Sequence, residues 1–460
     1  MTQTVSTAGR GKPGEAVGAG DDGGGPAKAA ELRDRRCRQA AGIEQGELML
    51  NTTTAAEELR DAMVDRIAAD RQALGLGFPE EAARALRSVP RHLFTGGVPL
   101  EDAYGDGAIV TVRGVDGVNL SSVSAAWLQA AMLCQADLKP GEKVLEVGSG
   151  GYNAALIAEL VGPSGSVTTV DIDPAVAERA RRCLADAGYA GVEVACADAE
   201  FEIEPGAAFD AIIVTVGVPD IPPAWWSQLG AGGRLIVPLR TMGLTRSWLL
   251  RRDGGALAAR DHFTCGFVPL RGAGARPGLS IPLRDDPAVS LWLGEDAAAS
   301  QVRDLRGILD LPRADARSGV TLSAGESCSG QDMWLATTVP GFCQVIADQE
   351  AIDAGIVALT WRWGSPAHVD GTTLAYRGTP LTAGGGDGAR ELVAYAHGPD
   401  AGRAAAFLAG QIGAWDRAGR PRPRLRVYPA GTPDGELADG FRLEKRHTRI
   451  VIDFLANDAR

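Results

Sequence analysis

One stretch decides the fold: Val144-Leu145-Glu146-Val147-Gly148-Ser149-Gly150-Gly151-Tyr152-Asn153. Residues 144–147 predict a short buried strand, and residues 152–161 predict a helix that begins directly after the glycines. A glycine turn between a first strand and a helix lets the backbone approach a ligand at the carboxyl edge of a sheet. The stretch therefore predicts a fold class and a binding site together.

Strand and helix patterns alternate over the next hundred residues. Further strands are expected at residues 167–170, 192–194, 210–216 and 234–238. A second helix is expected with Asp173 as its N-cap, Pro174 at its first position and Gly188 just past its end. This alternation predicts an α/β fold with a Rossmann-like, doubly wound, mostly parallel sheet and helices on both faces.

The chain divides into three expected parts. Residues 1–50 are rich in Gly, Ala, Ser and Thr and cannot bury enough apolar surface to fold, so a disordered tail is expected there. Residues 51–245 form the α/β domain, preceded by helical segments at 54–76, 79–88 and 124–138. Residues 246–460 predict an additional C-terminal α+β domain. Its strands are expected at 374–376, 392–396, 425–428 and 448–454, and its helices at 299–309 and 401–415.

Composition excludes several classes of function. The 460 residues include 46 basic and 58 acidic side chains, for a formal charge of −12 and a pI near 5.1, which argues against nucleic-acid binding. No apolar run reaches the roughly 18 residues of a membrane span. The seven cysteines are scattered, and only His262 and Cys265 are close enough in sequence to share a metal. We expect no metal site, no membrane contact and a cytoplasmic location.

Two ligand classes use a glycine turn of this kind. A dinucleotide site of the form G-x-G-x-x-G requires a third glycine where this chain has Asn153. S-adenosylmethionine has no pyrophosphate and does not demand that glycine, and its cationic sulfonium suits acidic surroundings such as Glu146. The pattern favours the methyl donor over the dinucleotide.

Acidic residues follow two further strands. Asp171 ends the second strand, where a carboxylate can accept hydrogen bonds from ribose hydroxyls in either ligand class. Asp198 ends the third strand, where a carboxylate can face the exocyclic amine of adenine. The alternative for each is a helix N-cap. Ligand-type residues at three successive strand ends favour a cofactor site over three separate caps.

The chain resembles protein L-isoaspartate O-methyltransferases over about residues 55–250. The matching blocks occur in the family's order, at residues 90–94 (Pro-Arg-His-Leu-Phe), 103–106 (Ala-Tyr-Gly-Asp), 122–124 (Ser-Val-Ser), 144–152, 209–215 and 229–238. More narrowly, it resembles the actinobacterial branch called FxLD-system methyltransferases. That branch has a long C-terminal extension and accompanies ribosomally made, modified peptides such as lanthipeptides and graspetides.

This resemblance implies a class I methyltransferase that transfers a methyl group from S-adenosylmethionine to a side-chain carboxylate. It implies that the glycine turn holds the methionine end of the cofactor, Asp171 the ribose, and Asp198 with Ala199 the adenine. The candidate cofactor residues are Glu146, Gly148, Ser149, Gly150, Asn153, Asp171, Ile172, Asp198 and Ala199. The candidate catalytic residues are Ser122, Ser124 and Thr215.

Ser124 matches the family's hydroxyl residue that contacts the acceptor carboxylate. Because a carboxylate is already ionised at neutral pH, no general base is required, and Ser124 would orient the acceptor. The alternative is that Ser124 caps the helix that follows it. The chain departs from the family in three places: the glycine turn is one residue shorter, Ala197-Asp198-Ala199 replaces Gly-Asp-Gly, and Ala126 replaces a proline.

Three functions compete. The first is a peptide-tailoring enzyme that esterifies an aspartate of a modified precursor peptide, leading to aspartimide and isoaspartate, with the C-terminal domain holding the peptide. The second is repair of isoaspartyl residues in damaged proteins. The third is a cofactor-binding scaffold without catalysis. The oligomeric state is left open.

Overall fold

The computed structural model describes residues 54–115, 117–295, 304–323, 326–379 and 389–455. Contacts divide the chain into two units, Met1–Ala56 and Glu57–Arg460, and the second unit contains all the strands named below. The expected disordered tail at 1–50 lies outside the described residues, as does most of the helix expected at 299–309. The described end of that segment holds only a short 3-10 turn, η3 (Ile308–Asp310), so a helix reaching residue 309 is wrong.

Short elements precede the main sheet. Residues 54–73 are helical. The others are α2 (Glu80–Ser88), η1 (Arg91–Phe94), α3 (Leu100–Ala103), β1 (Ile109–Arg113), β2 (Asn119–Val123) and α4 (Ala126–Ala136). β1 and β2 form an antiparallel pair in which Val110 lies opposite Ser122. The helix α4 follows β2 after two residues.

The parallel part of the main sheet has the order β5-β4-β3-β6-β7. Its elements are β3 (Lys143–Val147), α5 (Tyr152–Val161), β4 (Ser166–Asp171), α6 (Pro174–Asp186), β5 (Glu193–Cys196), β6 (Phe209–Val214), α7 (Pro223–Gln228) and β7 (Leu229–Thr241). The first strand β3 lies between β4 and β6, with Val144 opposite both Val167 and Ala211. This is the predicted doubly wound α/β fold, and its topological switch point lies between β3 and β6.

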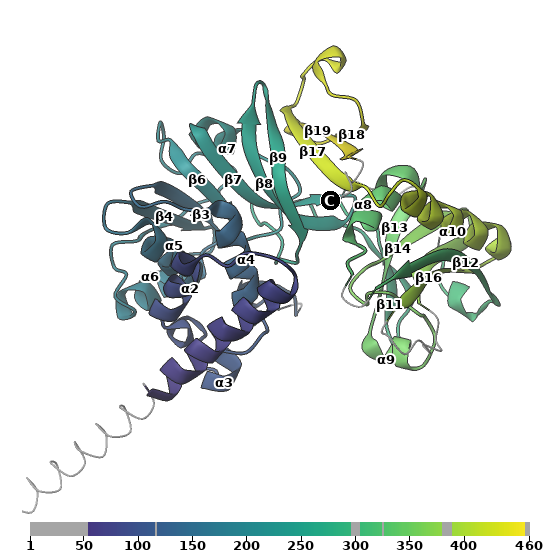
Figure 1. The fold of residues 1–460 in the computed structure, drawn as a ribbon, viewed down its shortest axis with the longest axis horizontal. Coiled ribbons are helices and arrows are strands. Elements are labelled where there is room, and N and C mark those ends of the chain that lie inside the picture. Colours follow the sequence, from purple (N-terminus) through teal and green to yellow (C-terminus); the bar gives the residue numbers. More distant parts are fainter. Residues whose placement is uncertain (1–53, 116, 296–303, 324–325, 380–388, 456–460) are drawn as a thin grey trace, which may run out of the picture. The chain divides into compact units, whose positions relative to one another are not determined.

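The sheet continues as an antiparallel extension beyond residue 245. The added strands are β8 (Leu244–Asp253), β9 (Ala256–Thr264), β17 (Arg422–Pro429), β18 (Phe441–Glu444) and β19 (Thr448–Leu455). They complete a ten-stranded sheet in the order β18-β19-β17-β9-β8-β7 and onward into the parallel strands (Figure 1). The last strands of the chain thus pair with the α/β domain.

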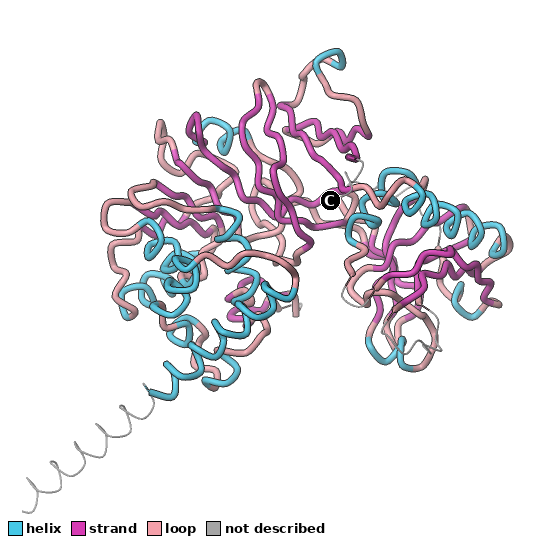
Figure 2. Tube along the Cα trace, viewed as in Figure 1, coloured by secondary structure: helices cyan, strands magenta, loops and turns pink. Residues whose placement is uncertain are grey.

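A second sheet has seven strands, and each pair of neighbouring strands in it is antiparallel. Figure 2 distinguishes the strands from the helices by colour. Its strands are β10 (Ser280–Arg284), β11 (Val289–Trp292), β12 (Arg313–Leu322), β13 (Phe342–Ala347), β14 (Ser365–Asp370), β15 (Thr373–Gly378) and β16 (Arg390–His397). Its helices are α8 (Ser329–Thr338), α9 (Gln349–Asp353) and α10 (Ala401–Arg417). One face of the sheet packs on α10 through Ala405, Leu408 and Ile412.

Local capping chemistry places α6 as predicted. The Asp173 carboxylate accepts hydrogen bonds from the backbone N–H groups of Ala175 (2.9 Å) and Val176 (3.4 Å), and Pro174 is the first helical residue. Gly188 follows the helix with φ +89°, a left-handed conformation that favours glycine. Because this cap fixes the residue at which α6 begins, it also fixes the residue at which the preceding strand β4 ends.

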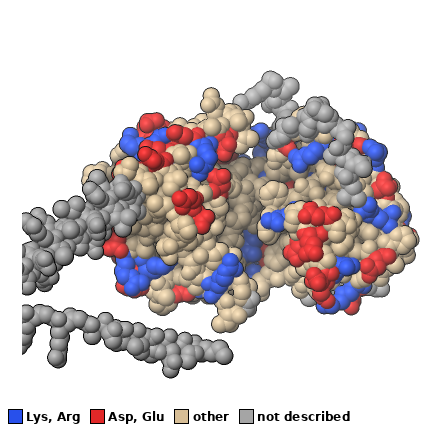
Figure 3. Space-filling model, turned by 90° about the horizontal axis from the view of Figure 1, so that it is seen from below, with Lys and Arg blue, Asp and Glu red and all other residues tan. Residues whose placement is uncertain are grey.

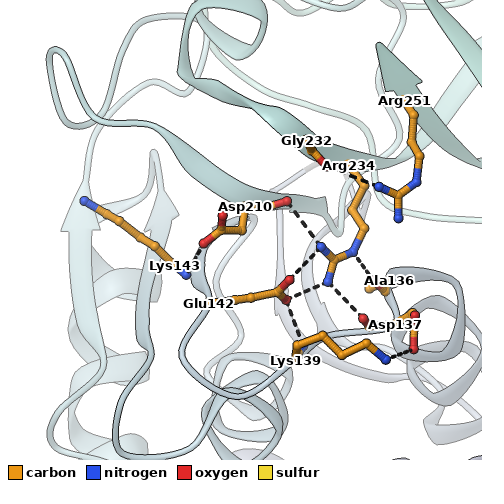
Figure 4. Close-up of polar contacts among 9 residues, drawn as sticks. All are labelled: Ala136, Asp137, Lys139, Glu142, Lys143, Asp210, Gly232, Arg234 and Arg251. Carbon is orange, nitrogen blue, oxygen red and sulfur yellow. Dashed lines mark hydrogen bonds and ion pairs between the residues drawn. The ribbon is translucent and has the colours of Figure 1, made fainter. Parts of the chain in front are cut away.

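A buried ion pair ties α4 to the centre of the sheet (Figure 4). The guanidinium of Arg234 on β7 donates to both carboxylate oxygens of Glu142, at 2.9 and 2.6 Å. It also donates to the carbonyls of Ala136 and Asp137 at the end of α4. Only 6% of the Arg234 side chain is exposed, and the Lys139 N–H provides a second donor to Glu142 Oε2 at 2.8 Å.

We predict that Arg234→Met lowers the free energy of unfolding by about 3–5 kcal/mol, because it removes the guanidinium that pairs with the Glu142 carboxylate and donates to two helix carbonyls. Urea unfolding followed by tryptophan fluorescence measures this. Arg251→Gln is the control, since Arg251 makes one hydrogen bond at the surface, to Gly232 O at 3.2 Å, and should change stability by less than about 0.5 kcal/mol. Equal stability of the two variants would contradict the prediction.

Candidate active site

A cavity lies at the carboxyl edge of the parallel strands, beside the switch point. Most of the predicted site residues line it: Ser122, Ser124, Glu146, Gly148, Ser149, Gly150, Asn153, Asp171 and Thr215. The fold therefore brings together residues of β2, β3, β4, the glycine turn and the first turn of α5. It adds Ser124, which follows β2, and Thr215, which follows β6. Ile172, Asp198 and Ala199 do not line this cavity.

Thr215 closes the glycine turn. Its hydroxyl lies 2.6 Å from the carbonyl oxygen of Gly148 and 3.1 Å from that of Val147. Gly148 has φ +98°, and a Cβ at this position would lie 2.8 Å from Thr215 Oγ1. A residue other than glycine would be strained and would clash, so the short turn is built around this contact.

Glu146 is fully buried beneath the turn. Its carboxylate accepts hydrogen bonds from Asn153 Nδ2 at 2.8 Å and from Thr169 Oγ1 at 2.5 Å. Burial raises the pKa of Glu146 to about 7, despite these two hydrogen bonds, and the nearby Asp171 carboxylate adds to the increase. Asn153, which occupies the position of the third glycine of a dinucleotide site, thus holds the carboxylate that lies beneath the turn.

The two serines come from an extended segment that leads into α4. Ser124 does not cap this helix: Ala125 is the N-cap, and no side chain accepts a capping hydrogen bond there. The carbonyl of Ser124 instead accepts a hydrogen bond (2.9 Å) from the buried guanidinium of Arg91. Arg91 also donates to Ala103 O at 2.8 Å and Gln129 Oε1 at 3.1 Å, which joins η1, α3 and α4.

Neither predicted nucleoside carboxylate is a helix N-cap. Asp171 precedes the cap of α6 and accepts hydrogen bonds from the N–H groups of Asp173 (2.9 Å) and Ser149 (3.2 Å). Asp198 accepts one from the N–H of Glu200 at 3.0 Å, in a turn that leads to no helix. The capping alternative is therefore removed for both residues.

Ser149 is the residue that most directly indicates that a cofactor fits this cavity. Ser149 Oγ is buried at the cavity wall and has no hydrogen-bond partner among the described residues, so a polar ligand group can satisfy it. The Asp171 carboxylate on the same wall provides an acceptor. No cluster of three His, Cys, Asp or Glu residues suited to a metal ion occurs within the described ranges.

Several groups at the site escaped the sequence reasoning. Arg91 and Gln129 lie close together only in the folded chain, and the segment Arg271–Ala273, which contacts Asp171 and Asp198, reads in the sequence as an ordinary glycine-rich turn. The one signal in the sequence is a basic residue, Arg271, in the loop that follows β9. Nothing in its spacing identifies the carboxylates it pairs with.

The surface outside the site is mixed in charge. Acidic and basic side chains are interspersed over the face drawn in Figure 3. Among the residues that the structure describes, no helix is long and apolar enough to cross a bilayer.

Two tryptophan pairs behave differently. Trp225 is buried and its indole N–H donates to Ala199 O at 2.8 Å, as expected for packing. Trp361 and Trp363 are each 61% exposed, and the Arg362 guanidinium lies 4.2 Å from the Trp363 ring centroid. Most of the surface of both side chains is therefore open to solvent.

Comparison with known proteins gives one consistent family. The family model described as "Protein-L-isoaspartate(D-aspartate) O-methyltransferase (PCMT)" matches residues 64–275. A protein-L-isoaspartate O-methyltransferase of Methanopyrus kandleri is 37% identical over 216 residues, which are 46% of this chain and 91% of that protein. Protein-L-isoaspartate O-methyltransferase 2 of Archaeoglobus fulgidus is 37% identical over 220 residues, 47% of this chain and 94% of that protein.

Two solved structures show weaker likeness. One, titled protein-L-isoaspartate O-methyltransferase, has a TM-score of 0.43 and 20% identity and covers 79% of this chain and 96% of its own. Another, from Plasmodium falciparum and solved with S-adenosyl-L-homocysteine, has a TM-score of 0.39 and 17% identity and covers 46% of this chain and 98% of its own.

The raised pKa of Glu146 predicts a pH dependence of stability. An acid whose pKa is higher in the folded chain contributes stability below about pH 4.5, and this is lost as the pH rises through about 7. The shift from 4.5 to about 7 corresponds to about 3 kcal/mol. Glu146→Gln mimics the neutral acid, so its stability relative to the wild type should rise by up to that amount between pH 5 and pH 8.

Urea unfolding of the cofactor-free protein at the two pH values measures this difference. Glu142→Gln is the matched control. Burial alone would raise the pKa of Glu142, but hydrogen bonds from Arg234 and the Lys139 N–H bring it below its usual value. Its contribution is lost only as the pH falls below about 4.5, so the effect of Glu142→Gln should be constant between pH 5 and pH 8. A Glu146→Gln effect equally constant over this range would refute a raised pKa.

Proposed function

Because the chain belongs to the protein-L-isoaspartate O-methyltransferase family, we propose that it methylates the free carboxylate of an isoaspartyl residue in a protein or peptide. It is an S-adenosylmethionine-dependent O-methyltransferase in this assignment. The observation that carries the proposal is the cavity that the glycine turn, Asp171 and Ser124 line together. The residue proposed to contact the acceptor thus lines the same cavity as those proposed to hold the cofactor.

The residues divide into a cofactor side and an acceptor side. S-adenosylmethionine supplies an electrophilic methyl group on a sulfonium when bound. Gly148, Ser149 and Gly150 would hold its methionine end, and Asp171 its ribose. Ser124 would donate its hydroxyl to the acceptor carboxylate and fix one oxygen in line with the methyl group. Such positioning supplies up to about 7–11 kcal/mol in well-oriented reactions, and an ionised carboxylate needs no base.

Arg91 positions the acceptor side. Its side chain is fully buried, and the three hydrogen bonds described for it all go to neutral oxygens, those of Ala103, Ser124 and Gln129. Its guanidinium also lies 4.9 Å from the ring centroid of Tyr152, another residue of the cavity wall. A positive charge that contacts only neutral groups attracts an anion nearby, so Arg91 supports binding of a carboxylate beside Ser124.

A narrower function is a second candidate. In it the acceptor is an aspartate of a ribosomally made, modified peptide; the backbone nitrogen then attacks the methyl ester, a C–N bond forms, methanol leaves, and an aspartimide results. The exposed pair Trp361 and Trp363 favours this reading, because exposed aromatic side chains beside a guanidinium are typical of peptide-contacting surfaces.

The experiment that tests the proposal offers the full-length protein a synthetic isoaspartyl peptide and its normal aspartyl counterpart with methyl-labelled cofactor. Methylation of the isoaspartyl peptide alone is the expected result. If neither peptide is methylated but a cyclised precursor peptide is methylated and then dehydrated, the narrower function is favoured. Methylation of no acceptor would refute both.

We predict that Ser124→Ala lowers kcat/KM by about 10-fold to 100-fold, because one oriented donor to the acceptor is removed while cofactor binding is retained. Steady-state methylation of the isoaspartyl peptide measures the change. Ser227→Ala is the control, since Ser227 bonds Glu202 at the surface, outside the cavity. Unchanged activity in Ser124→Ala would exclude its assigned role.

We also predict that cofactor binding displaces a proton. At pH 7 about half of the Glu146 side chains are protonated, and a sulfonium cation bound in the same cavity lowers the pKa of that carboxyl. Calorimetry in buffers of different ionisation enthalpy should detect up to about half a proton released by S-adenosylmethionine. The neutral thioether S-adenosylhomocysteine should release less, and Glu146→Gln should abolish the difference. Equal release by both ligands would contradict the prediction.

A further inference from the structure

A segment between β9 and β10 covers the part of the site where a nucleoside would bind. Arg271 extends its guanidinium to Asp171 Oδ1 at 3.4 Å and to Asp173 Oδ2 at 3.1 Å. Two residues later, the N–H of Ala273 donates to Asp198 Oδ2 at 2.8 Å. The segment 271–273 therefore contacts both of the carboxylates that were assigned to the cofactor.

Gly272 brings the backbone against the site. It has φ +88°, and a Cβ added there would lie 2.3 Å from Asp198 Oδ2 and 2.6 Å from Ile172 Cδ1. Any side chain would therefore collide with Asp198 and Ile172, two of the predicted cofactor residues. This close approach explains why Ile172 and Asp198 do not line the open cavity, whereas Asp171 does.

The contacts reproduce the donors of an adenosine. A ribose presents hydroxyl donors to a carboxylate at the end of the second strand, and here a guanidinium takes their place on Asp171. Adenine presents an amine donor, and here a backbone N–H takes its place on Asp198. The two carboxylates are satisfied by the chain itself.

The residues before the segment are anchored, the Arg446 guanidinium donates to Ala273 O at 3.2 Å, and a second cavity lies beside the segment. Gly217 N–H donates to Val268 O at 2.8 Å, and Leu270 N–H donates to Gly217 O at 3.0 Å, which fixes the residues before it. Leu270 and Gly274, which flank the segment, line a second cavity together with Glu200, Arg276 and His447. This second cavity gives residues 271–273 room to leave Asp198.

We propose that Arg271-Gly272-Ala273 is an internal occupant of the adenosine half of the site, which the cofactor must displace to bind. The proposal rests on the proposed function, because it takes S-adenosylmethionine as the ligand. A competing internal contact lowers the apparent affinity by the fraction of chains in which the site is open. The strength of this internal contact thus sets the apparent Kd for the cofactor.

Two variants test the occupant from different sides. Arg271→Ala removes the guanidinium from Asp171 and Asp173, and Gly272→Ala introduces a Cβ that the space beside Asp198 cannot accept. Each should lower the Kd for S-adenosylhomocysteine by about 3-fold to 10-fold in calorimetric titrations of the full chain. Arg284→Ala is the control: it also removes one arginine charge, but its hydrogen bond to Asp286 O (3.0 Å) and its ion pair with Asp310 (3.6 Å) lie outside both cavities. Its Kd should equal that of the wild type.

Hydrogen exchange of the wild type supplies a second readout. Binding of S-adenosylhomocysteine should increase amide exchange in a peptide spanning residues 270–275, whereas a segment that merely lines the bound cofactor would become more protected. Increased protection, or a higher Kd in Arg271→Ala, would overturn the proposal and make Arg271 a cofactor contact. An unchanged Kd in both variants would also overturn it. Tight binding without methylation of any acceptor would instead refute the proposed function and leave the occupant standing, and no binding by any variant would refute both.

Discussion

The buried carboxylate of Glu146 is the constraint on which the site depends. It lies under the glycine turn, and its two oxygens are held by side chains from α5 and β4. A carboxylate without solvent is costly unless its oxygens accept hydrogen bonds, so Asn153 and Thr169 must keep their positions. These positions in turn fix where α5 starts and where β4 lies relative to β3. The geometry of the glycine turn follows from this packing. Thr215, the residue after β6, holds the turn through its hydrogen bond to Gly148 O.

The parallel half of the sheet could be read from the sequence because its determinants are local. The strand at 144–147, the helix Tyr152–Val161 and the cap at Asp173 each depend on residues within a few positions of one another. The site followed from this, since parallel strands end at one edge and bring their last residues together. Asp171 was identified for that reason, whereas Ser124 and Ser149 were identified from the family resemblance, and all three line one cavity.

The remainder depends on contacts between distant residues. β17 and β19 add to the main sheet after more than 150 intervening residues, and their own pattern does not indicate which edge they join. The strand β12 was missed because alternation in Arg313–Leu322 is mostly between exposed and half-buried positions, which lacks a strong apolar period. Arg91 illustrates the same limit within the site. Its partners Ala103, Ser124 and Gln129 are up to 38 positions away, and only the packing of η1 against α4 brings them to one guanidinium.

An acidic site for a cationic ligand creates a problem when the ligand is absent. Glu146, Asp171, Asp173 and Asp198 lie at neighbouring strand ends, and like charges in a partly buried cleft repel one another. Burial raises the pKa of both carboxyl groups, Glu146 and Asp171, and for Glu146 it raises the pKa to about 7, so that protonation of Glu146 reduces the repulsion. The Arg271 guanidinium reduces it further by pairing with Asp171 and Asp173, and it helps to bring the pKa of Asp173 below its usual value. The Arg271 guanidinium therefore stabilises the empty site by the same electrostatic attraction that the sulfonium would supply. The carboxylates that would favour tight cofactor binding are thus the ones whose pairing with Arg271 stabilises the enzyme without cofactor.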